Sequence, residues 1–112
     1  MIIYIAGRMT GLPDKGRALF KKAEDTIREA GHIPLNPALL PDNMPREKYM
    51  PICMAMLEAA DAIFMLGNWE DSNGAALERI YAQYQGKVIL MEGENLSERD
   101  PQWYERRRAR HR

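Results

Sequence analysis

The sequence predicts an α/β fold of the three-layer, Rossmann-like (flavodoxin-like) kind, in which helices cover both faces of a parallel sheet of four to five strands. Two observations predict it. Short apolar runs alternate with longer segments of helical periodicity, in the order strand, helix, strand, helix, strand, helix, strand, and this alternation is typical of a parallel sheet with right-handed crossovers. The first run is also apolar at every position, as in a strand that is buried on both faces.

Length and composition are those of one small domain. The chain has 112 residues, of which 46% are hydrophobic, so it can bury a modest core without disulfides or metals. Its 16 basic and 16 acidic side chains balance, and no global charge marks nucleic acid as the main partner. Six arginines near the C-terminus distinguish a basic tail, residues 96–112, from a mildly acidic domain, residues 1–95.

Cysteine content and the N-terminal residues indicate where the protein works. Cys53 is the only cysteine, so no disulfide can form within the chain and a reducing compartment is expected. Residues 1–6 are apolar but too few for a signal peptide or a membrane span. We therefore expect a cytoplasmic protein with no membrane partner.

The first expected strand covers residues 2–6, and a turn-rich loop over residues 7–13 follows it. The loop contains two glycines, a cation and a hydroxyl, namely Gly7, Gly11, Arg8 and Thr10. Backbone N–H groups freed by glycine, together with these side chains, can cradle a phosphate. A strand followed by Gly-x-x-x-Gly also occurs in ordinary strand-to-helix turns, so both interpretations stay open.

A helix is expected next. Apolar side chains recur at helical spacing, at Leu19, Ala23, Ile27 and Ala30. Asp14 is the candidate N-cap, and Gly31 is expected to stop the helix at the C′ position. We interpret this helix as scaffold.

The second strand is expected over residues 32–35, and Asn36 and Pro37 end it. Because Asn36 follows the carboxyl end of a strand, its amide could donate to a ligand; an Asx-type turn before proline is the structural alternative. His32, at the other end of the strand, is interpreted as an exposed or capping histidine, and not as a catalytic base or metal ligand.

Residues 39–46 contain two prolines and should form a loop long enough to be one wall or lid of a pocket. The following helix is expected over residues 47–60, and Pro51 fits it only in the first turn. One face of this helix is expected to hold Met50, Met54 and Leu57, with Cys53 and Met56 beside it. Such methionines favour a core or a subunit interface over a cofactor contact.

The third strand, residues 62–66, leads through Trp69 to the last helix, and residues 87–91 supply the fourth strand. Trp69 could stack on a nucleobase or pack over the sheet edge, and the sequence leaves both open. Residues 101–112 are expected to form either a short docked helix or a disordered arm.

The segment from Ser72 to Glu78 is the strongest candidate for a functional site. Ser72 is a suitable N-cap, because its hydroxyl can accept from the free N–H groups of the first turn, and Gly74 would let a ligand approach that backbone closely. Helical geometry places Glu78 roughly 110° from the centre of an apolar stripe that is expected to be buried. The stripe consists of Leu77, Ile80, Tyr81 and Tyr84.

Glu78 has two interpretations. A solvated helix carboxylate is the common one, but no cation lies three or four residues away to pair with it on a helix surface. In an open α/β sheet, a helix start beyond the carboxyl end of a strand is where ligands bind. That location favours a functional carboxylate.

Together these residues resemble the nucleoside 2-deoxyribosyltransferase superfamily, and in particular the small phage and bacterial proteins grouped as the domain of unknown function DUF4406. The similarity extends from Met1 to about Met91, and its motifs are jointly fairly specific. They are Met1-Ile-Ile-Tyr-Ile-Ala-Gly7, Met9-Thr10-Gly11-Leu12-Pro13, Ala30-Gly31-His32, Asn36-Pro37, Ala60-Asp61-Ala62, Ser72-x-Gly74-x-x-x-Glu78 and Gly86-Lys87-Val88.

The resemblance implies an N-glycosidase or 2-deoxyribosyltransferase that cleaves the N-glycosidic bond of a deoxynucleoside, or of its 5′-monophosphate, through a glutamate nucleophile. Glu78 matches that glutamate, and Tyr4 matches a tyrosine near the reacting sugar. No cofactor and no metal are implied. Monophosphate hydrolases of the superfamily carry serine six residues before the glutamate, where transferases carry aspartate. Ser72 therefore favours a nucleotide, because it can hold a 5′-phosphate that aspartate would repel.

The candidate substrate-binding residues are Gly7, Arg8, Met9, Gly11, Asn36, Trp69, Ser72 and Gly74. Gly7 and Gly11 match the phosphate loop of the family. Arg8 departs from the proline or serine that is usual there, so we expect the phosphate to be held differently.

Cys53 is a larger departure, because family enzymes commonly place there an aspartate that helps bind the sugar and manages the proton delivered to the base. A mostly protonated thiol is a poor substitute, since general acid–base help is typically worth about 10²- to 10⁴-fold in rate. Three alternatives follow: a local shift of the alignment, compensation by another residue such as Glu58, or a non-catalytic protein that sequesters or senses a nucleotide in the same pocket.

The resemblance also implies a homodimer or larger homo-oligomer, because superfamily members complete their sites across a subunit boundary. For the arginines of residues 106–112, a solvated or interface-crossing arm is favoured over a contact with nucleic acid.

Overall fold

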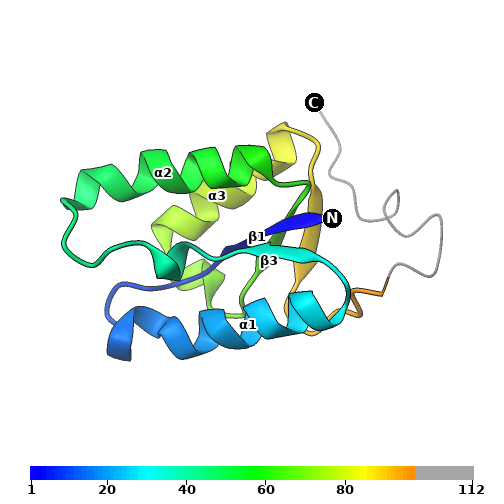
Figure 1. The fold of residues 1–112 in the computed structure, drawn as a ribbon. Helices are drawn as coiled ribbons and strands as arrows, with labels where there is room; N and C mark the ends of the chain where they lie inside the picture. The colour runs from blue at the N-terminus through cyan, green and yellow to red at the C-terminus, as the bar shows by residue number, and fades with distance from the viewer. Residues whose placement is uncertain (98–112) are drawn as a thin grey trace.

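The structure, a computed structural model, describes residues 1–97 and contains one parallel four-stranded sheet. The strands are β1 (Ile2–Ala6), β2 (Ile33–Leu35), β3 (Ala62–Met65) and β4 (Val88–Met91), in the order β2-β1-β3-β4. Three α-helices connect them, namely α1 (Arg17–Glu29), α2 (Arg46–Ala59) and α3 (Asn73–Tyr84). Helix α1 covers one face of the sheet, and α2 and α3 cover the other (Figure 1). The predicted three-layer fold is confirmed, with four strands.

The connections between these elements contain three short 3-10 helices: η1 (Pro13–Gly16), η2 (Pro37–Leu39) and η3 (Trp69–Asp71). Within residues 1–97, no helix combines the length and the apolar character that crossing a membrane requires. The predicted helix or arm at residues 101–112 lies outside the part of the chain that the structure describes.

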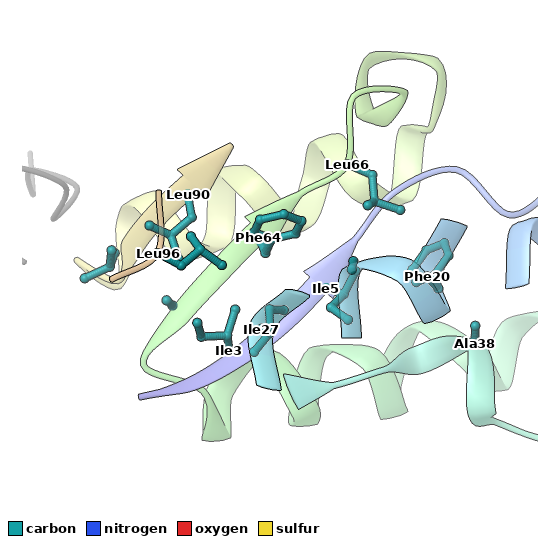
Figure 2. Close-up of a cluster of buried hydrophobic side chains, with 12 residues drawn as sticks. Ile3, Ile5, Phe20, Ile27, Ala38, Phe64, Leu66, Leu90 and Leu96 are labelled. Atoms are coloured by element: carbon teal, nitrogen blue, oxygen red, sulfur yellow. The ribbon is translucent and has the colours of Figure 1, made fainter. Parts of the chain in front are cut away.

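Strand β1 distributes its side chains between the two layers. It pairs with β2 from Ile2 to Tyr4 and with β3 from Ile3 to Ala6. Because neighbouring residues in a strand point to opposite faces, Ile3 and Ile5 pack toward α1, whereas Tyr4 packs toward α2 and α3. Figure 2 shows the cluster of buried apolar side chains on the α1 side, to which Ile3 and Ile5 belong. The alternation thus places a phenol in the layer opposite the apolar one.

Helix α1 begins later than predicted. Its N-cap is Gly16, and Asp14 instead has a left-handed backbone conformation with φ of 49°. Lys15 follows with φ of 55° and Gly16 with φ of 74°. The prediction of Asp14 as N-cap is therefore wrong, because three successive left-handed residues precede the helix. Its predicted end is confirmed, with Gly31 just beyond the C-cap at φ of 87°.

His32 was predicted to be either exposed or capping, and its burial shows that the exposed alternative is wrong. Its side chain has 4% exposure. Nδ1 lies 2.9 Å from the terminal nitrogen of Met1, and Nε2 lies 2.8 Å from the carbonyl oxygen of Leu96. The imidazole joins the start of β1 to the segment after β4. Both partners are distant in sequence, which is why local pattern did not reveal this role.

Helix α2 begins one residue earlier than predicted, and this changes the position of Pro51. The proline lies in the second turn of the helix and not in the first. It has no N–H for the carbonyl of Glu47, but both residues are exposed, so water can satisfy that carbonyl. Leu57 is fully buried, whereas Met50 and Met54 are half-buried.

Helix α3 turns a different face to the sheet from the one predicted. Its buried residues are Ala75, Glu78 and Ala82. Leu77, Ile80 and Tyr84 are instead 50%, 62% and 70% exposed. Three of the four residues of the predicted apolar stripe are therefore on the outside, and only Tyr81 is half-buried. Small alanines instead let the helix pack closely on the sheet and against α2. The consequence for Glu78 is burial.

Candidate functional site

A pocket of about 850 Å³ opens beyond the carboxyl end of β1. The chain leaves β1 toward β2 on one side and β3 lies on the other, so this is the point where the strand order reverses and where ligands bind in such sheets. Eight of the predicted site residues line it: Tyr4, Gly7, Arg8, Met9, Gly11, Ser72, Gly74 and Glu78. The structure thus brings together segments that lie more than 60 residues apart in sequence.

Glu78 and Tyr4 form the floor of the pocket. The Tyr4 hydroxyl donates a hydrogen bond of 2.5 Å to Glu78 Oε2. Both side chains are almost fully buried, at 1% and 5% exposure. They meet because Tyr4 is on the α2 and α3 side of β1 and Glu78 is on the sheet-facing side of α3. A buried carboxylate held by a phenol is thereby exposed to a ligand on one side only.

The protonation of this pair follows from its burial. Burial raises the pKa of Glu78 to about 7, and the hydrogen bond from Tyr4 opposes that rise. Burial, and next the negative charge of Glu78, raise the pKa of Tyr4 well above its usual value. Tyr4 therefore remains a hydrogen-bond donor at neutral pH, while Glu78 exchanges between its neutral and ionised forms.

Cys53 lines the same pocket from α2, beside this pair. Burial raises the pKa of its thiol and so does the charge of Glu78, whereas a hydrogen bond with Tyr4 lowers it. The thiol is thus neutral at physiological pH. Glu58, considered from the sequence as a substitute for the missing carboxylate, is exposed on α2 and does not line the pocket.

The start of α3 supplies backbone donors to the pocket. Ser72 is the N-cap, and its Oγ accepts from the Ala75 N–H at 3.1 Å, as predicted. A Cβ on Gly74 would lie 3.3 Å from Met50 Cε, so the absence of a side chain there lets α2 approach α3. The positive end of the helix dipole faces the pocket, where it favours an anion.

The loop after β1 is folded back on itself. The Arg8 backbone N–H donates to Asn68 Oδ1 at 2.9 Å, which ties this loop to the one after β3. Arg8 Nε donates to the Thr10 carbonyl oxygen at 2.9 Å. Gly7 has to be glycine, because a Cβ would lie 2.6 Å from Leu66 Cδ1. The loop therefore holds the Arg8 guanidinium in place at the pocket. In that position the guanidinium is available to an anionic ligand such as a phosphate.

Two of the predicted site residues are elsewhere. Asn36 Oδ1 accepts from the Ala38 N–H at 2.9 Å, which is the Asx-type turn that was the structural alternative. Trp69 packs against the α2 and α3 layer, with the Arg79 guanidinium 5.1 Å from its ring centroid. Neither side chain lines the pocket.

Several pocket residues were missed by the sequence analysis. The predicted wall or lid at residues 39–46 does line the pocket, but its contributions were not named, and neither were those of η1, the first turn of α2 and the segment that leads into α3. These residues are Lys15, Asp42, Met44, Arg46, Tyr49, Asp71 and Asn73. The sequence feature that could have identified these segments as part of a binding pocket is their charged, turn-rich composition. Among residues 1–97, no group of three or more His, Cys, Asp or Glu side chains is arranged to hold a metal ion.

Comparison with known proteins gives a family match and several similar structures. The family model described as "Domain of unknown function (DUF4406)" matches residues 1–91. Among curated proteins, none matches the sequence. A 2-deoxyribosyltransferase from Leishmania mexicana is 30% identical with a TM-score of 0.65; the match covers 80% of this chain and 62% of that protein.

Two further solved structures have the same fold at lower identity. A 2-deoxyribosyltransferase from Bacillus psychrosaccharolyticus is 21% identical with a TM-score of 0.65, and the match covers 85% of this chain and 76% of that one. The CMP N-glycosidase BcmB of Clostridium botulinum is 16% identical with a TM-score of 0.57, over 88% of this chain and 75% of that one. The arrangement of strands and helices is therefore shared with two 2-deoxyribosyltransferases and a CMP N-glycosidase.

Proposed function

The chain belongs to the DUF4406 family, and from that premise we propose that it is an N-glycosidase or 2-deoxyribosyltransferase-like enzyme acting on a deoxynucleoside 5′-monophosphate, with Glu78 as nucleophile. The observation that carries the proposal is the buried Glu78 carboxylate, held by Tyr4 on the floor of a pocket of about 850 Å³. That volume is within the range of small-molecule sites. The fold shared with deoxyribosyltransferases and a CMP N-glycosidase supports the same reaction class.

Glu78 would act through the oxygen that Tyr4 does not hold. Tyr4 fixes Oε2, which leaves Oε1 to attack the anomeric carbon of the sugar. As the bond from that carbon to the base breaks, its electron pair goes to the base, and a bond from the carbon to Oε1 forms. The ionised carboxylate stabilises the positive charge that develops on the sugar. A water molecule or a second base then attacks the same carbon and releases Glu78.

The departing base needs a proton or a stable anionic form. Cys53 is the polar side chain next to the Tyr4–Glu78 pair on the α2 side, and burial keeps its thiol protonated. A neutral thiol is a weak acid for this task compared with a carboxylic acid. We infer that bases which leave readily as anions, or take a proton from water, are the better substrates.

The phosphate would bind where the two glycine-containing loops meet. Ser72, Gly74 and the start of α3 offer a hydroxyl and a positive helix end, and the loop from Gly7 to Gly11 offers Arg8 on the opposite side. Ser72 is neutral, so the residue at this position does not repel a phosphate, although two carboxylates, those of Asp42 and Asp71, also line the pocket. These groups support a nucleotide over an unphosphorylated nucleoside.

Base release from a panel of deoxyribonucleotides and ribonucleotides tests the proposal. The wild-type protein is expected to release base from at least one deoxynucleoside monophosphate, and Glu78→Gln is expected to release none. Glu29→Gln, at the exposed end of α1, is a matched control that should keep full activity. Release that persists in Glu78→Gln would refute the assignment of the nucleophile.

A non-catalytic nucleotide-binding protein is the second candidate, and Cys53 is the observation that favours it. A thiol in place of a carboxylic acid leaves the pocket able to bind but poorly able to protonate a base. Cys53→Asp distinguishes the two candidates. An enzyme limited by proton delivery should release base faster after this change, whereas a binding protein that lacks the chemistry altogether should bind nucleotide without release in either form.

A homo-oligomer is proposed for the assembly. Leu77, Ile80 and Tyr84 form an exposed apolar ridge on the outer side of α3, hereafter the α3 ridge. Exposed patches of this kind are typical of protein interfaces. Since α3 also provides Glu78 and the phosphate-facing helix start, a partner bound on the α3 ridge would lie close to the site.

A further inference from the structure

The backbone before α1 is strained at two residues that are not glycine. Asp14 has φ of 49° and ψ of 34°, and Lys15 has φ of 55° and ψ of 25°. Non-glycine residues adopt this left-handed conformation rarely, and two in succession are rarer still. Such strain persists only where surrounding contacts impose it, and it concentrates at functional sites. The local sequence does not explain the left-handed conformation of Asp14 and Lys15, so contacts with other parts of the chain must impose it.

The contacts that impose this turn come from the candidate phosphate loop. The Lys15 N–H donates to the Leu12 carbonyl oxygen at 3.0 Å. A Cβ on Gly16 would lie 3.0 Å from the Arg8 carbonyl oxygen and 3.1 Å from Leu12 Cδ1. The turn is thus packed directly on the loop, and its result is to direct the Lys15 side chain to the wall of the pocket.

Lys15 is held at the pocket by weak contacts. Its ammonium lies 3.4 Å from Asp42 Oδ1 and 6.0 Å from the Tyr49 ring centroid. The side chains of Lys15 and Asp42 are 49% and 54% exposed, and ion pairs at such exposure contribute little. Arg17 binds the same carboxylate oxygen more closely. Asp42 therefore keeps a partner when Lys15 leaves it.

We propose that Lys15 is a specificity-determining residue, which favours a substrate carrying a 5′-phosphate because that phosphate takes the Lys15 ammonium from Asp42. The inference rests on the proposed function and adds the residue that discriminates nucleotide from nucleoside. A phosphate dianion attracts an ammonium more strongly than a carboxylate that already pairs with Arg17. The strained turn holds this cation at the wall of the pocket, next to the loop that contains Arg8.

Lys15→Gly separates this role from a structural one, because glycine adopts the left-handed conformation without strain. Binding is measured by calorimetry in the Glu78→Gln background, so that no turnover occurs, with each deoxynucleoside 5′-monophosphate and its nucleoside as probes. We expect Lys15→Gly to weaken monophosphate binding by about 10- to 100-fold, the usual worth of a hydrogen bond to a charged group. Nucleoside binding should change less than about 2-fold, and Tm should not fall.

Three companion variants sharpen the test. Lys15→Arg should retain most of the monophosphate affinity, because it keeps the charge. Asp42→Asn should tighten monophosphate binding up to about 5-fold, since it removes the competitor of the phosphate. Lys48→Met, at an exposed position on α2 outside the pocket, is the control for loss of a surface cation and should bind as the parent does.

Each other outcome overturns the proposal. Equal weakening of nucleotide and nucleoside by Lys15→Gly, no weakening, a lower Tm, or weaker binding in Asp42→Asn would each show that Lys15 does not discriminate by phosphate. If base release by the wild-type protein still requires Glu78 in that case, the proposed function stands and only Lys15 is misassigned. Absence of both nucleotide binding and base release would refute the two together.

Discussion

The two layers that cover the sheet differ in what they bury. The layer between α1 and the sheet is centred on apolar side chains, including Ile3, Ile5, Phe20 and Ile27 (Figure 2), and the one carboxylate that α1 buries, that of Glu24, pairs with Lys21 and Arg28. The layer under α2 and α3 buries Tyr4 and the carboxylate of Glu78 among alanines and a few larger apolar side chains. A small domain has little stability to spare. The contrast indicates that the α1 layer serves mainly to stabilise the fold. The α2 and α3 layer contains a buried carboxylate, which lowers the free energy of unfolding but provides a reactive group.

Glu78→Gln is expected to have the largest effect of the changes considered. It should lower the rate of base release and raise the free energy of unfolding. Base release should fall by at least about 10³-fold, because an amide cannot replace the nucleophile. Stability should rise at pH 8. The folded-state pKa of Glu78 is about 7 against 4.5 for the free side chain, so its stability contribution is complete below pH 4.5 and is lost as the pH rises through 7.

At about 1.4 kcal/mol per pKa unit, removing this ionisation should gain about 3 kcal/mol at pH 8 and almost nothing at pH 4.5. Urea unfolding at the two pH values measures the difference. If Glu78→Gln were less stable than the wild-type protein at pH 8, ionisation of the buried Glu78 would not lower the stability of the fold as proposed.

Ile27→Ala is the matched change in the other layer. Ile27 is fully buried between α1 and the sheet, and truncation of such a side chain typically costs about 2 to 5 kcal/mol. We expect that loss in denaturant unfolding, with kcat per folded molecule unchanged below the transition. A fall in kcat of the folded protein would show that the two layers are coupled.

Tyr4→Phe tests how the hydrogen bond controls Glu78. The phenol lowers the pKa of Glu78, against the larger effect of burial, so its loss should raise that pKa above about 7. Base release at pH 7 should fall by about 10- to 100-fold, the worth of a hydrogen bond to a charged group, and should partly recover at pH 9. A pH profile identical to that of the wild-type protein would contradict this role.

Ile80→Lys is expected to have the smallest effect on the isolated chain. Ile80 lies at the centre of the α3 ridge and is 62% exposed, so the monomer should keep its stability within about 0.5 kcal/mol. If the α3 ridge is a subunit interface, sedimentation should show a smaller species than for the wild-type protein. An unchanged mass would place any interface elsewhere.

The fold was predictable from the sequence because its pattern is local. A short apolar run that ends in glycine, such as residues 2–6, is typical of a buried strand, and its bounds in the structure are those predicted. The glycine at position 31 likewise ends α1 as its backbone freedom indicates. For the site, the absence of a cation partner for Glu78 and its location in a helix that starts beyond a strand end favoured a functional carboxylate.

What the sequence did not predict depends on packing between distant segments. The apolar stripe of α3 pointed to the wrong buried face, because the close approach of α3 to the sheet selects Ala75 and Ala82 instead. Lys15 reaches the pocket only through a left-handed turn imposed by Arg8 and Leu12. His32 is buried by contacts with Met1 and Leu96. None of these three outcomes follows from periodicity or spacing.

The pH dependence of kcat/KM for base release tests the central claim most directly, because this quantity reports the ionisation of the free enzyme. With Glu78 as nucleophile and a pKa of about 7, kcat/KM should rise about tenfold per pH unit below 6 and reach a plateau above pH 8. A profile that is flat through pH 7, or that falls as the pH rises through it, would contradict a nucleophile that must ionise in this buried site.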